Sequence, residues 1–157
     1  MPSGYLDSSF LIAYLYEERD DPERFRQANR LIGPIRGGSV EAVVSFYALP
    51  ELYSYVNRYQ PREEVGGVFR ASLIQLFSLP ISIVPFLDRS ELNHLRQRFT
   101  ISDPYDARHV AAALFKGCDA IIAFDEHFRE VSSVIPAYTP DEYLAMPKSS
   151  EAGPELG

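Results

Sequence analysis

The sequence predicts an α/β protein built on a mostly parallel β-sheet. Short apolar segments rich in β-branched and aromatic residues alternate with longer segments whose apolar residues recur at helical spacing, and this alternation is typical of parallel sheets. The chain has 157 residues, of which 46% are hydrophobic, so a single domain can bury its own core. We find no internal repeat or linker, and we expect one domain over residues 1–146 and a disordered tail over 147–157.

A short strand and two helices are expected at the start of the chain. Residues 3–7 form the strand, and residues 8–16 follow as a helix with apolar side chains at helical spacing. Asp21 is placed as the N-cap of the next helix, with a proline at the first helical position. This helix runs to about Ile35 and is followed by a Gly-Gly-Ser break.

Two strands and three helices are expected in the middle of the chain. Residues 40–46 and 81–85 are rich in β-branched residues, as strands are. Pro50 begins a helix that has apolar residues on one face. Residues 61–77 form a second helix, weakened by two glycines, and residues 88–99 form a third that begins with an aspartate cap.

The last third of the chain contains the clearest helix signals. Asp103 is placed as an N-cap, Pro104 as the first helical residue and Gly117 as the stop. Residues 120–124 then form a strand, and residues 134–138 form another.

Four carboxylates fall at strand ends or in first helical turns. Asp7 directly follows the first strand and Asp125 follows the strand at 120–124, while Glu51 and Asp106 lie in the first turns of their helices. Each has an ordinary explanation as a helix cap or as a partner of the helix dipole. That explanation is weakest for Asp125, because no regular helical pattern follows it. Ligands of parallel sheets bind beyond the carboxyl ends of the strands, so we expect the four carboxylates to converge there.

Converging carboxylates repel one another unless protons or cations intervene. Oxygen ligands without cysteine or histidine suit Mg²⁺ or Mn²⁺. Such ions bind phosphate oxygens and activate water, so the predicted chemistry is hydrolysis of a phosphodiester without a protein nucleophile. Asp103 is an additional candidate at this site, although capping is its favoured role.

The order and spacing of these motifs resemble the PIN domain, and in particular the small VapC toxins of toxin–antitoxin pairs. The matching segments are "YLDSSFLIAYL", "ALPELYSYV", "DPYDARHVAAAL" and "DAIIAFDEHF". The matching residues are Asp7 with Ser8, Glu51, Asp106 with Ala107, and Asp125 with Phe128. The resemblance spans roughly residues 5–130. It has one departure, because the family often has threonine or serine where this chain has Ala123.

The resemblance implies a PIN-like three-layer sandwich with the sheet at its centre. It also implies a metal-dependent endoribonuclease that acts on structured RNA such as tRNA, with Mg²⁺ or Mn²⁺ bound by the four carboxylates and Ser8 as an additional site residue. A homodimer and a cognate antitoxin, one segment of which fills the acidic groove, are implied as well.

Two other functions are kept open. One is a PIN-fold RNA-binding or assembly module with weak catalysis, which Ala123 and the acidic net charge favour. The other is a phosphatase of the haloacid dehalogenase type or a response-regulator receiver, which also place an aspartate at a strand end. Ser9 stands where that phosphatase needs a second aspartate, and the strands at 40–46 and 81–85 lack the aspartate that a receiver needs.

The composition limits the classes of partner and compartment. A net charge of −7 is unusual for a nucleic-acid binder, but 13 of the 15 basic residues are arginine, which suits bidentate phosphate contact, and bound cations would offset some of the acids. The single cysteine, Cys118, excludes an internal disulfide and a cysteine zinc site and agrees with a reducing cytosol. No apolar run approaches the ~20 residues of a membrane span and no signal peptide is evident, so we expect a cytoplasmic protein without membrane contact.

The remaining polar residues near the acids are given ordinary roles. The three histidines are too scattered for a zinc site, and His109 and His127 are expected on the surface or behind the acids. Arg108 is expected to be a solvated residue on its helix.

Overall fold

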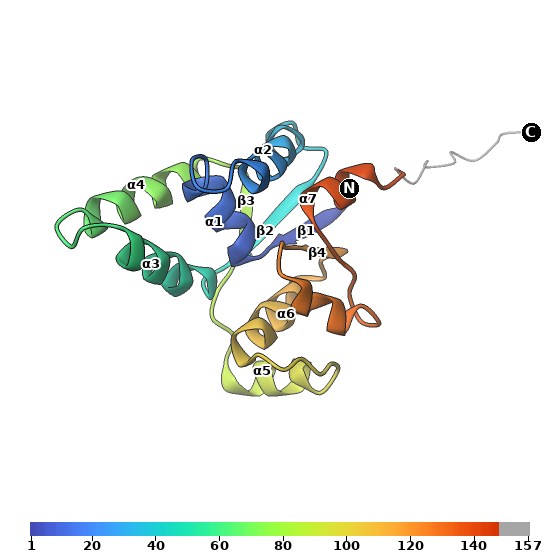
Figure 1. The fold of residues 1–157 in the computed structure, drawn as a ribbon. Helices are drawn as coiled ribbons and strands as arrows, with labels where there is room; N and C mark the ends of the chain where they lie inside the picture. The colour runs from blue at the N-terminus through green and yellow to red at the C-terminus, as the bar shows by residue number, and fades with distance from the viewer. Residues whose placement is uncertain (148–157) are drawn as a thin grey trace, which may run out of the picture.

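The computed structural model describes residues 1–147 and arranges five strands in one sheet (Figure 1). The strand order is β3-β2-β1-β4-β5, and all neighbouring strands are parallel. The strands are β1 (Ser3–Leu6), β2 (Glu41–Ser45), β3 (Ile81–Val84), β4 (Ala120–Ile122) and β5 (Ala137–Tyr138). The expected α/β class is confirmed. The expected tail lies outside the described residues from residue 148 onward.

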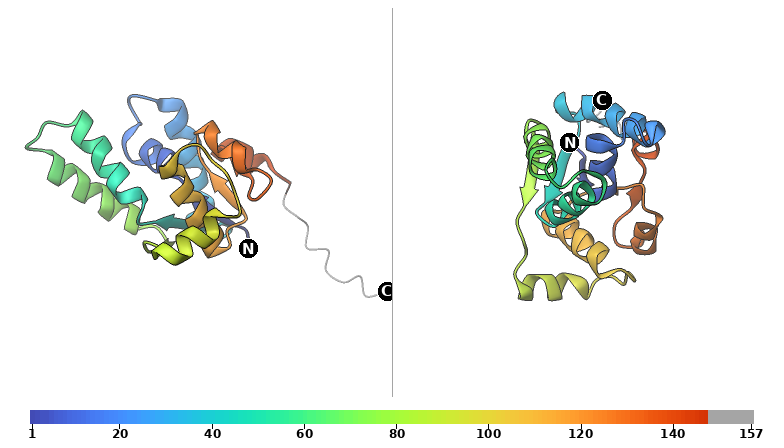
Figure 2. Two further views of the ribbon diagram at one scale, coloured as in Figure 1. Left: turned by 90° about the horizontal axis from the view of Figure 1, so that it is seen from below. Right: turned by 60° about the vertical axis from the view of Figure 1, so that its left-hand side comes forward.

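Helices cover both faces of the sheet, which gives the fold three layers (Figure 2). One layer contains α1 (Ser8–Tyr16), α2 (Pro22–Arg36) and α7 (Pro140–Ala145), and the other contains α5 (Arg89–Arg96) and α6 (Pro104–Lys116). Alternate strand residues enter the two cores: Leu6 and Ile122 belong to the first, and Tyr5 and Ile121 to the second. The central strand β1 therefore contributes to both cores.

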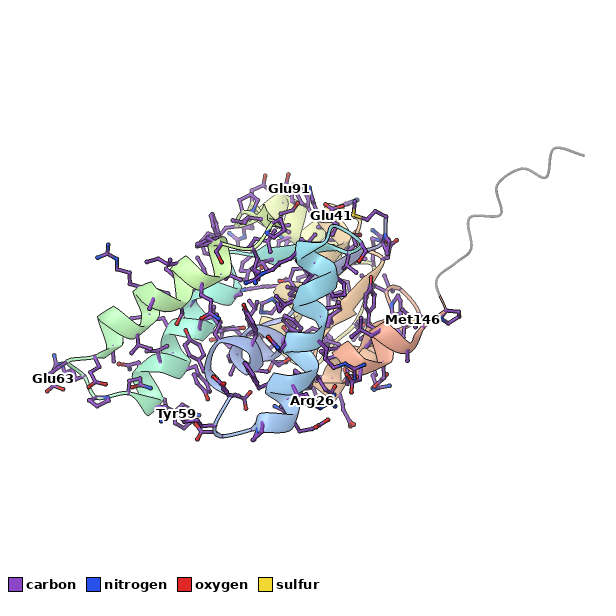
Figure 3. All side chains as sticks on the ribbon, turned by 90° about the horizontal axis from the view of Figure 1, so that it is seen from above. Arg26, Glu41, Tyr59, Glu63, Glu91 and Met146 are labelled. Atoms are coloured by element: carbon purple, nitrogen blue, oxygen red, sulfur yellow. The ribbon has the colours of Figure 1, made fainter. Side chains whose placement is uncertain are left out.

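Helices α3 (Ala48–Tyr59) and α4 (Val65–Phe77) form a hairpin that extends away from the sheet (Figure 1). The connecting loop, with Glu63, lies at the outer end of this arm (Figure 3). Leu52 and Leu76 are fully buried and belong to the first core, whereas Tyr53 and Ile74 are exposed along the arm.

Two boundaries near the predicted site differ from expectation. Helix α3 begins at Ala48, before Pro50, because the first N–H groups of a helix need no intrahelical partner and proline is tolerated in the first turn. Strand β4 ends at Ile122 and does not reach residue 124, because the N–H of Phe124 donates to the hydroxyl of Ser9. The chain thus leaves the sheet just before Asp125.

Three further elements are shorter than predicted. Helix α4 starts at Val65, after a turn closed by the N–H of Glu64 donating to the carbonyl of Pro61. Helix α5 ends at Arg96, whereas a helix to residue 99 was expected. Strand β5 begins at Ala137, whereas a strand from residue 134 was expected.

Two helices were not predicted. One is the 3-10 helix η1 (Glu126–Val131), and the other is α7, whose cap is Thr139. Asp141 at the start of α7 pairs with Arg26 and Arg30 of α2, and these ion pairs tie the end of the described chain to the first helical layer. Within residues 1–147, no helix combines the length and the apolar character that crossing a membrane requires.

Candidate active site

The four predicted carboxylates line one cleft of about 800 Å³ at the carboxyl edge of the sheet. Asp7 follows β1 and caps α1, and Asp125 lies three residues beyond β4 and caps η1. Because β1 and β4 are parallel neighbours, both aspartates lie at the same edge. Glu51 and Asp106 reach the cleft from the first turns of α3 and α6. Ser8 and Asp103, the two additional candidates, line it as well.

Asp7 is buried and is held by the start of α1. Its Oδ2 accepts hydrogen bonds from the N–H and the hydroxyl of Ser9, at 3.0 and 2.8 Å. Its Oδ1 lies 3.9 Å from Nε2 of His109. Burial raises the pKa of Asp7, although His109 and the bonds from Ser9 oppose this. One oxygen is therefore committed to the helix cap, and the other remains available on the side of His109.

Glu51 is held by two donors from other elements. Its carboxylate accepts a hydrogen bond from the hydroxyl of Ser8, and its two oxygens lie 3.1 and 3.0 Å from Nε2 of His109. On the other side of the imidazole ring, Nδ1 is hydrogen-bonded to the hydroxyl of Tyr5, which lies 2.7 Å from the hydroxyl of Ser45. A buried polar chain thus runs from β2 through β1 and α6 to Glu51.

His109 belongs to the site, behind the acids and not on the surface. Its side chain is 1% exposed. Burial lowers the pKa of His109, but the hydrogen bond to Glu51 and the charge of Asp7 more than offset this, so the pKa is raised overall. The sequence contains a signal for this position, because His109 is three residues from Asp106 and shares the buried face of α6 with Val110 and Ala113.

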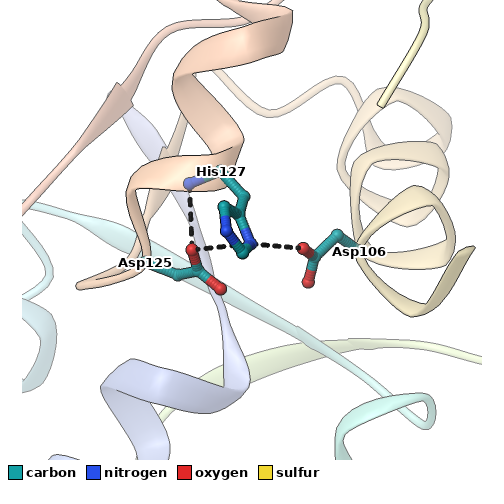
Figure 4. Close-up of side chains that lie close together, drawn as sticks. All are labelled: Asp106, Asp125 and His127. Carbon is teal, nitrogen blue, oxygen red and sulfur yellow. Dashed lines mark hydrogen bonds and ion pairs between the residues drawn. The ribbon is translucent and has the colours of Figure 1, made fainter. Parts of the chain in front are cut away.

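Asp106 and Asp125, which line the cleft, form a second cluster with His127 (Figure 4). Nδ1 of His127 lies 3.2 Å from Oδ1 of Asp125 and 3.6 Å from Oδ2 of Asp106. Burial, and then the charges of Asp103, Asp125 and Asp7, raise the pKa of Asp106 to about 6. Its Oδ2 is enclosed and has no hydrogen-bond partner among residues 1–147.

This oxygen, which has no hydrogen-bond donor among the described residues, is evidence that the site fits a divalent cation. A buried carboxylate oxygen normally has a hydrogen-bond donor, and an oxygen without one is destabilising unless a cation or a proton neutralises it. Here the oxygen faces a second carboxylate and an imidazole, and one ligand atom from each of the three side chains lies within 4.8 Å of the others. Oxygen-rich sites of this kind suit Mg²⁺ and Mn²⁺.

The contacts bear on two questions that the sequence raises. Asp103 caps α6, since its Oδ1 accepts from the N–H groups of Tyr105 and Asp106, as favoured. A hydroxyl from α1 lies beside the segment that contains Ala123. Ser9 donates to Asp7 and accepts from the N–H of Phe124, so a hydroxyl lies between the first aspartate and the segment that leads to Asp125.

Basic and aromatic side chains complete the walls of the cleft. Arg108 is exposed, as expected, yet it lies beside the acids, with its guanidinium carbon 5.9 Å from the ring centre of Tyr47 and 5.6 Å from that of Tyr105. Arg58 and Tyr59, at the end of α3, line the cleft from the arm. The cleft therefore combines an acidic floor with arginine and aromatic walls.

Comparison with known proteins connects this arrangement to one family. The family model described as PIN domain matches residues 4–134. No curated protein matches the chain significantly in sequence.

Solved structures match the fold at low identity. VapBC from Salmonella typhimurium bound to DNA is 14% identical, with a TM-score of 0.64, covering 89% of this chain and 99% of its own. VapC20 of Mycobacterium tuberculosis, named as a toxin that cleaves the sarcin–ricin loop, is 19% identical, with a TM-score of 0.61, covering 84% of this chain and 95% of its own. VapBC2 from Rickettsia felis bound to a promoter DNA fragment is 12% identical, with a TM-score of 0.61 and coverages of 87% and 98%.

Proposed function

The chain belongs to the PIN domain family, and from this premise we propose that it is a metal-dependent endoribonuclease that hydrolyses RNA phosphodiester bonds. The observation that carries the proposal is the meeting of four carboxylates at one cleft, with an enclosed oxygen of Asp106 that lacks a hydrogen-bond partner among the described residues. Family membership excludes the phosphatase and receiver alternatives.

We assign Asp7, Asp106 and Asp125 as the residues that would hold Mg²⁺ or Mn²⁺, with Glu51 as the fourth carboxylate of the set. When bound, such an ion supplies charge neutralisation at the phosphate and activation of a water molecule. Ser8 and His109 keep the Glu51 carboxylate at the wall of the cleft, so it needs no reorganisation when substrate arrives.

The walls of the cleft supply contacts for RNA. Arg58 and Arg108 offer guanidinium groups for the phosphates, and the exposed ring of Tyr105 offers a face on which an unstacked base can lie. Sequence-specific RNA recognition generally targets unpaired loops, because their bases can be splayed out. A structured RNA with such a loop, tRNA among them, is the proposed substrate class.

We further propose that the chain is the toxin of a type II toxin–antitoxin pair and forms a homodimer. Support comes from similar folds named as VapBC complexes and as a VapC toxin. A cognate antitoxin segment would occupy the same cleft and compete with RNA for its arginines.

The test is cleavage of total RNA in the presence of Mn²⁺ or Mg²⁺. We expect Asp7→Asn and Asp125→Asn each to lower the cleavage rate by about 100-fold or more, because each removes a metal ligand. The matched control is Asp20→Asn, an exposed aspartate in the turn after α1 that does not line the cleft. Circular dichroism should show an unchanged fold in all three variants.

Undiminished cleavage by the Asp7 and Asp125 variants would sink the proposal. The alternative, an RNA-binding or assembly module with weak catalysis, rests on Ala123. It predicts instead that the wild-type protein binds RNA and leaves it intact with either ion.

A further inference from the structure

We propose that His127 is a metal ligand together with Asp106 and Asp125, and that its imidazole makes the site prefer Mn²⁺ to Mg²⁺. This inference rests on the proposed function, because it concerns the same cleft. It adds a nitrogen ligand to a site whose sequence-predicted ligands are all carboxylates, and it assigns a role in ion selection to a residue expected to lie on the surface or behind the acids.

The geometry directs the imidazole at both carboxylates. Nδ1 of His127 is 3.2 Å from Asp125 and 3.6 Å from Asp106, so a single ring nitrogen lies between the two acids (Figure 4). The N–H of His127 also donates to Oδ1 of Asp125 at 2.9 Å. This bond begins η1 and fixes the backbone from which the ring projects over the acids.

Asp106 and His127 differ in how much of each side chain is exposed to solvent. The side chain of Asp106 is 15% exposed, whereas that of His127 is 64% exposed. Oδ2 of Asp106, which has no hydrogen-bond partner among the described residues, thus marks the more buried side of the cluster, and the imidazole lies on its more exposed side. An exposed ring can turn to complete the coordination of an ion without disturbing the packed core.

The chemistry of the donors then decides which ion is preferred. Mg²⁺ is a hard ion that favours carboxylate and water oxygens and keeps strict octahedral geometry. Imidazole nitrogen binds first-row transition ions more readily than Mg²⁺, and Mn²⁺ is the ion of that series that also suits carboxylate oxygens. A set of two carboxylates and one imidazole nitrogen therefore favours Mn²⁺ over Mg²⁺ more strongly than carboxylates alone.

A simple ion pair is the competing explanation for the position of His127, and it predicts the opposite sign. If His127 served only as a positive partner for the acids, its removal would relieve competition with the metal. Binding of both ions would then become tighter. A ligand role predicts that Mn²⁺ binding becomes weaker and that Mg²⁺ binding changes little.

The experiment measures ion affinity in the full chain without RNA. Calorimetric titrations with Mn²⁺ and Mg²⁺ would compare wild type, His127→Ala, His127→Asn and the control His94→Ala, an exposed histidine on α5. We expect His127→Ala to weaken Mn²⁺ binding by about tenfold or more and to change Mg²⁺ binding by less than about threefold. His127→Asn replaces the nitrogen with an amide oxygen and should likewise lose the preference for Mn²⁺.

Pulsed electron paramagnetic resonance gives a second readout that does not depend on affinity. Nitrogen modulation from a coordinated imidazole should be present in Mn²⁺-loaded wild type and His94→Ala, and it should be lost in His127→Ala. The assignment would be overturned if His127→Ala weakened the binding of both ions equally or tightened the binding of both. An unchanged nitrogen signal in this variant would overturn it as well.

The outcomes also separate this inference from the proposed function. If wild type binds both ions and cleaves RNA while the His127 variants keep its ion preference, the ligand role fails and the nuclease stands. If wild type binds neither ion, the metal-dependent nuclease fails and the ligand role fails with it.

Discussion

At the scale of single residues, Asp106 is the acid whose environment most opposes its charge. Its pKa is raised from 3.8 to about 6, first by burial and then by the neighbouring carboxylates. Between those two values the folded protein holds a proton that the unfolded chain has released. The stability that comes from this difference is present at low pH and is lost as the pH rises through about 6. Burial raises the pKa of Asp7 as well, which acts in the same direction.

Removing the charge of Asp106 should therefore stabilise the metal-free protein at neutral pH. We expect Asp106→Asn to raise the free energy of unfolding by about 1–2 kcal/mol near pH 7.5, after allowance for solvent screening, and to have little effect near pH 4. Thermal unfolding in a chelator across this pH range measures the effect, with the exposed Asp20→Asn as control. If Asp106→Asn were less stable than wild type near pH 7.5, the charge of Asp106 would not be destabilising and the prediction would be contradicted.

The four acids could be predicted at this scale, but their partners could not. An acid at a strand end is visible in the sequence, and the parallel topology then determines which edge it occupies. By contrast, the contact between His109 and Tyr5 joins residues 104 positions apart. The sequence gives no distance between side chains of this separation, so the polar chain behind Glu51 became apparent only in the fold.

At the scale of elements, α6 is the helix that the sequence predicted best, with observed bounds at Pro104 and Lys116. Its cap, its initial proline and its terminal glycine are local signals, and the structure has each of them at the predicted position. Gly117 adopts φ 72°, the left-handed conformation that other residues enter at a cost. Gly67, in contrast, lies in the first turns of α4 with open space where a Cβ would be.

The same substitution at these two glycines should have opposite effects. Gly117→Ala should lower the free energy of unfolding by about 1 kcal/mol, because alanine is strained at positive φ. Gly67→Ala should raise it by about 0.5 kcal/mol, because alanine favours the helix and meets no neighbour. Urea unfolding of the two variants provides the measurement, and a change of the same sign in both would contradict it.

Short elements were harder to predict than long ones. Helix α7 has six residues and η1 is a 3-10 helix of six, so neither repeats an apolar pattern long enough to be distinctive. Helix α7 does carry a local signal, since Thr139 accepts from the N–H of Glu142 as an N-cap and a proline follows it. Its position against α2 depends on the distant pairing of Arg26 with Asp141.

At the scale of the whole molecule, the proposed metal site would couple folding to ion binding. The carboxylates come from elements on both sides of the sheet, so an ion held among them joins α1, α6 and the segment after β4. Only the folded chain assembles these ligands. The ion must then stabilise the folded state by mass action.

We therefore expect Mn²⁺ to raise the melting temperature in a concentration-dependent way. At 100 times the dissociation constant the gain in unfolding free energy should be about 2.7 kcal/mol. Asp125→Asn should lose most of this gain, whereas Asp20→Asn should keep it. Differential scanning fluorimetry would report both, and an ion-independent melting temperature in wild type would favour the assembly-module alternative.

The central position of β1 determines when, during synthesis, the cleft can assemble. Gly4 pairs with Ala120, so one side of β1 waits for a partner strand that is made more than a hundred residues later. Until that strand and Asp125 emerge, the nascent chain carries Asp7 and Glu51 but cannot assemble the cleft. The proposed nuclease would therefore stay harmless to the messenger and the ribosome that produce it until Asp125 has emerged.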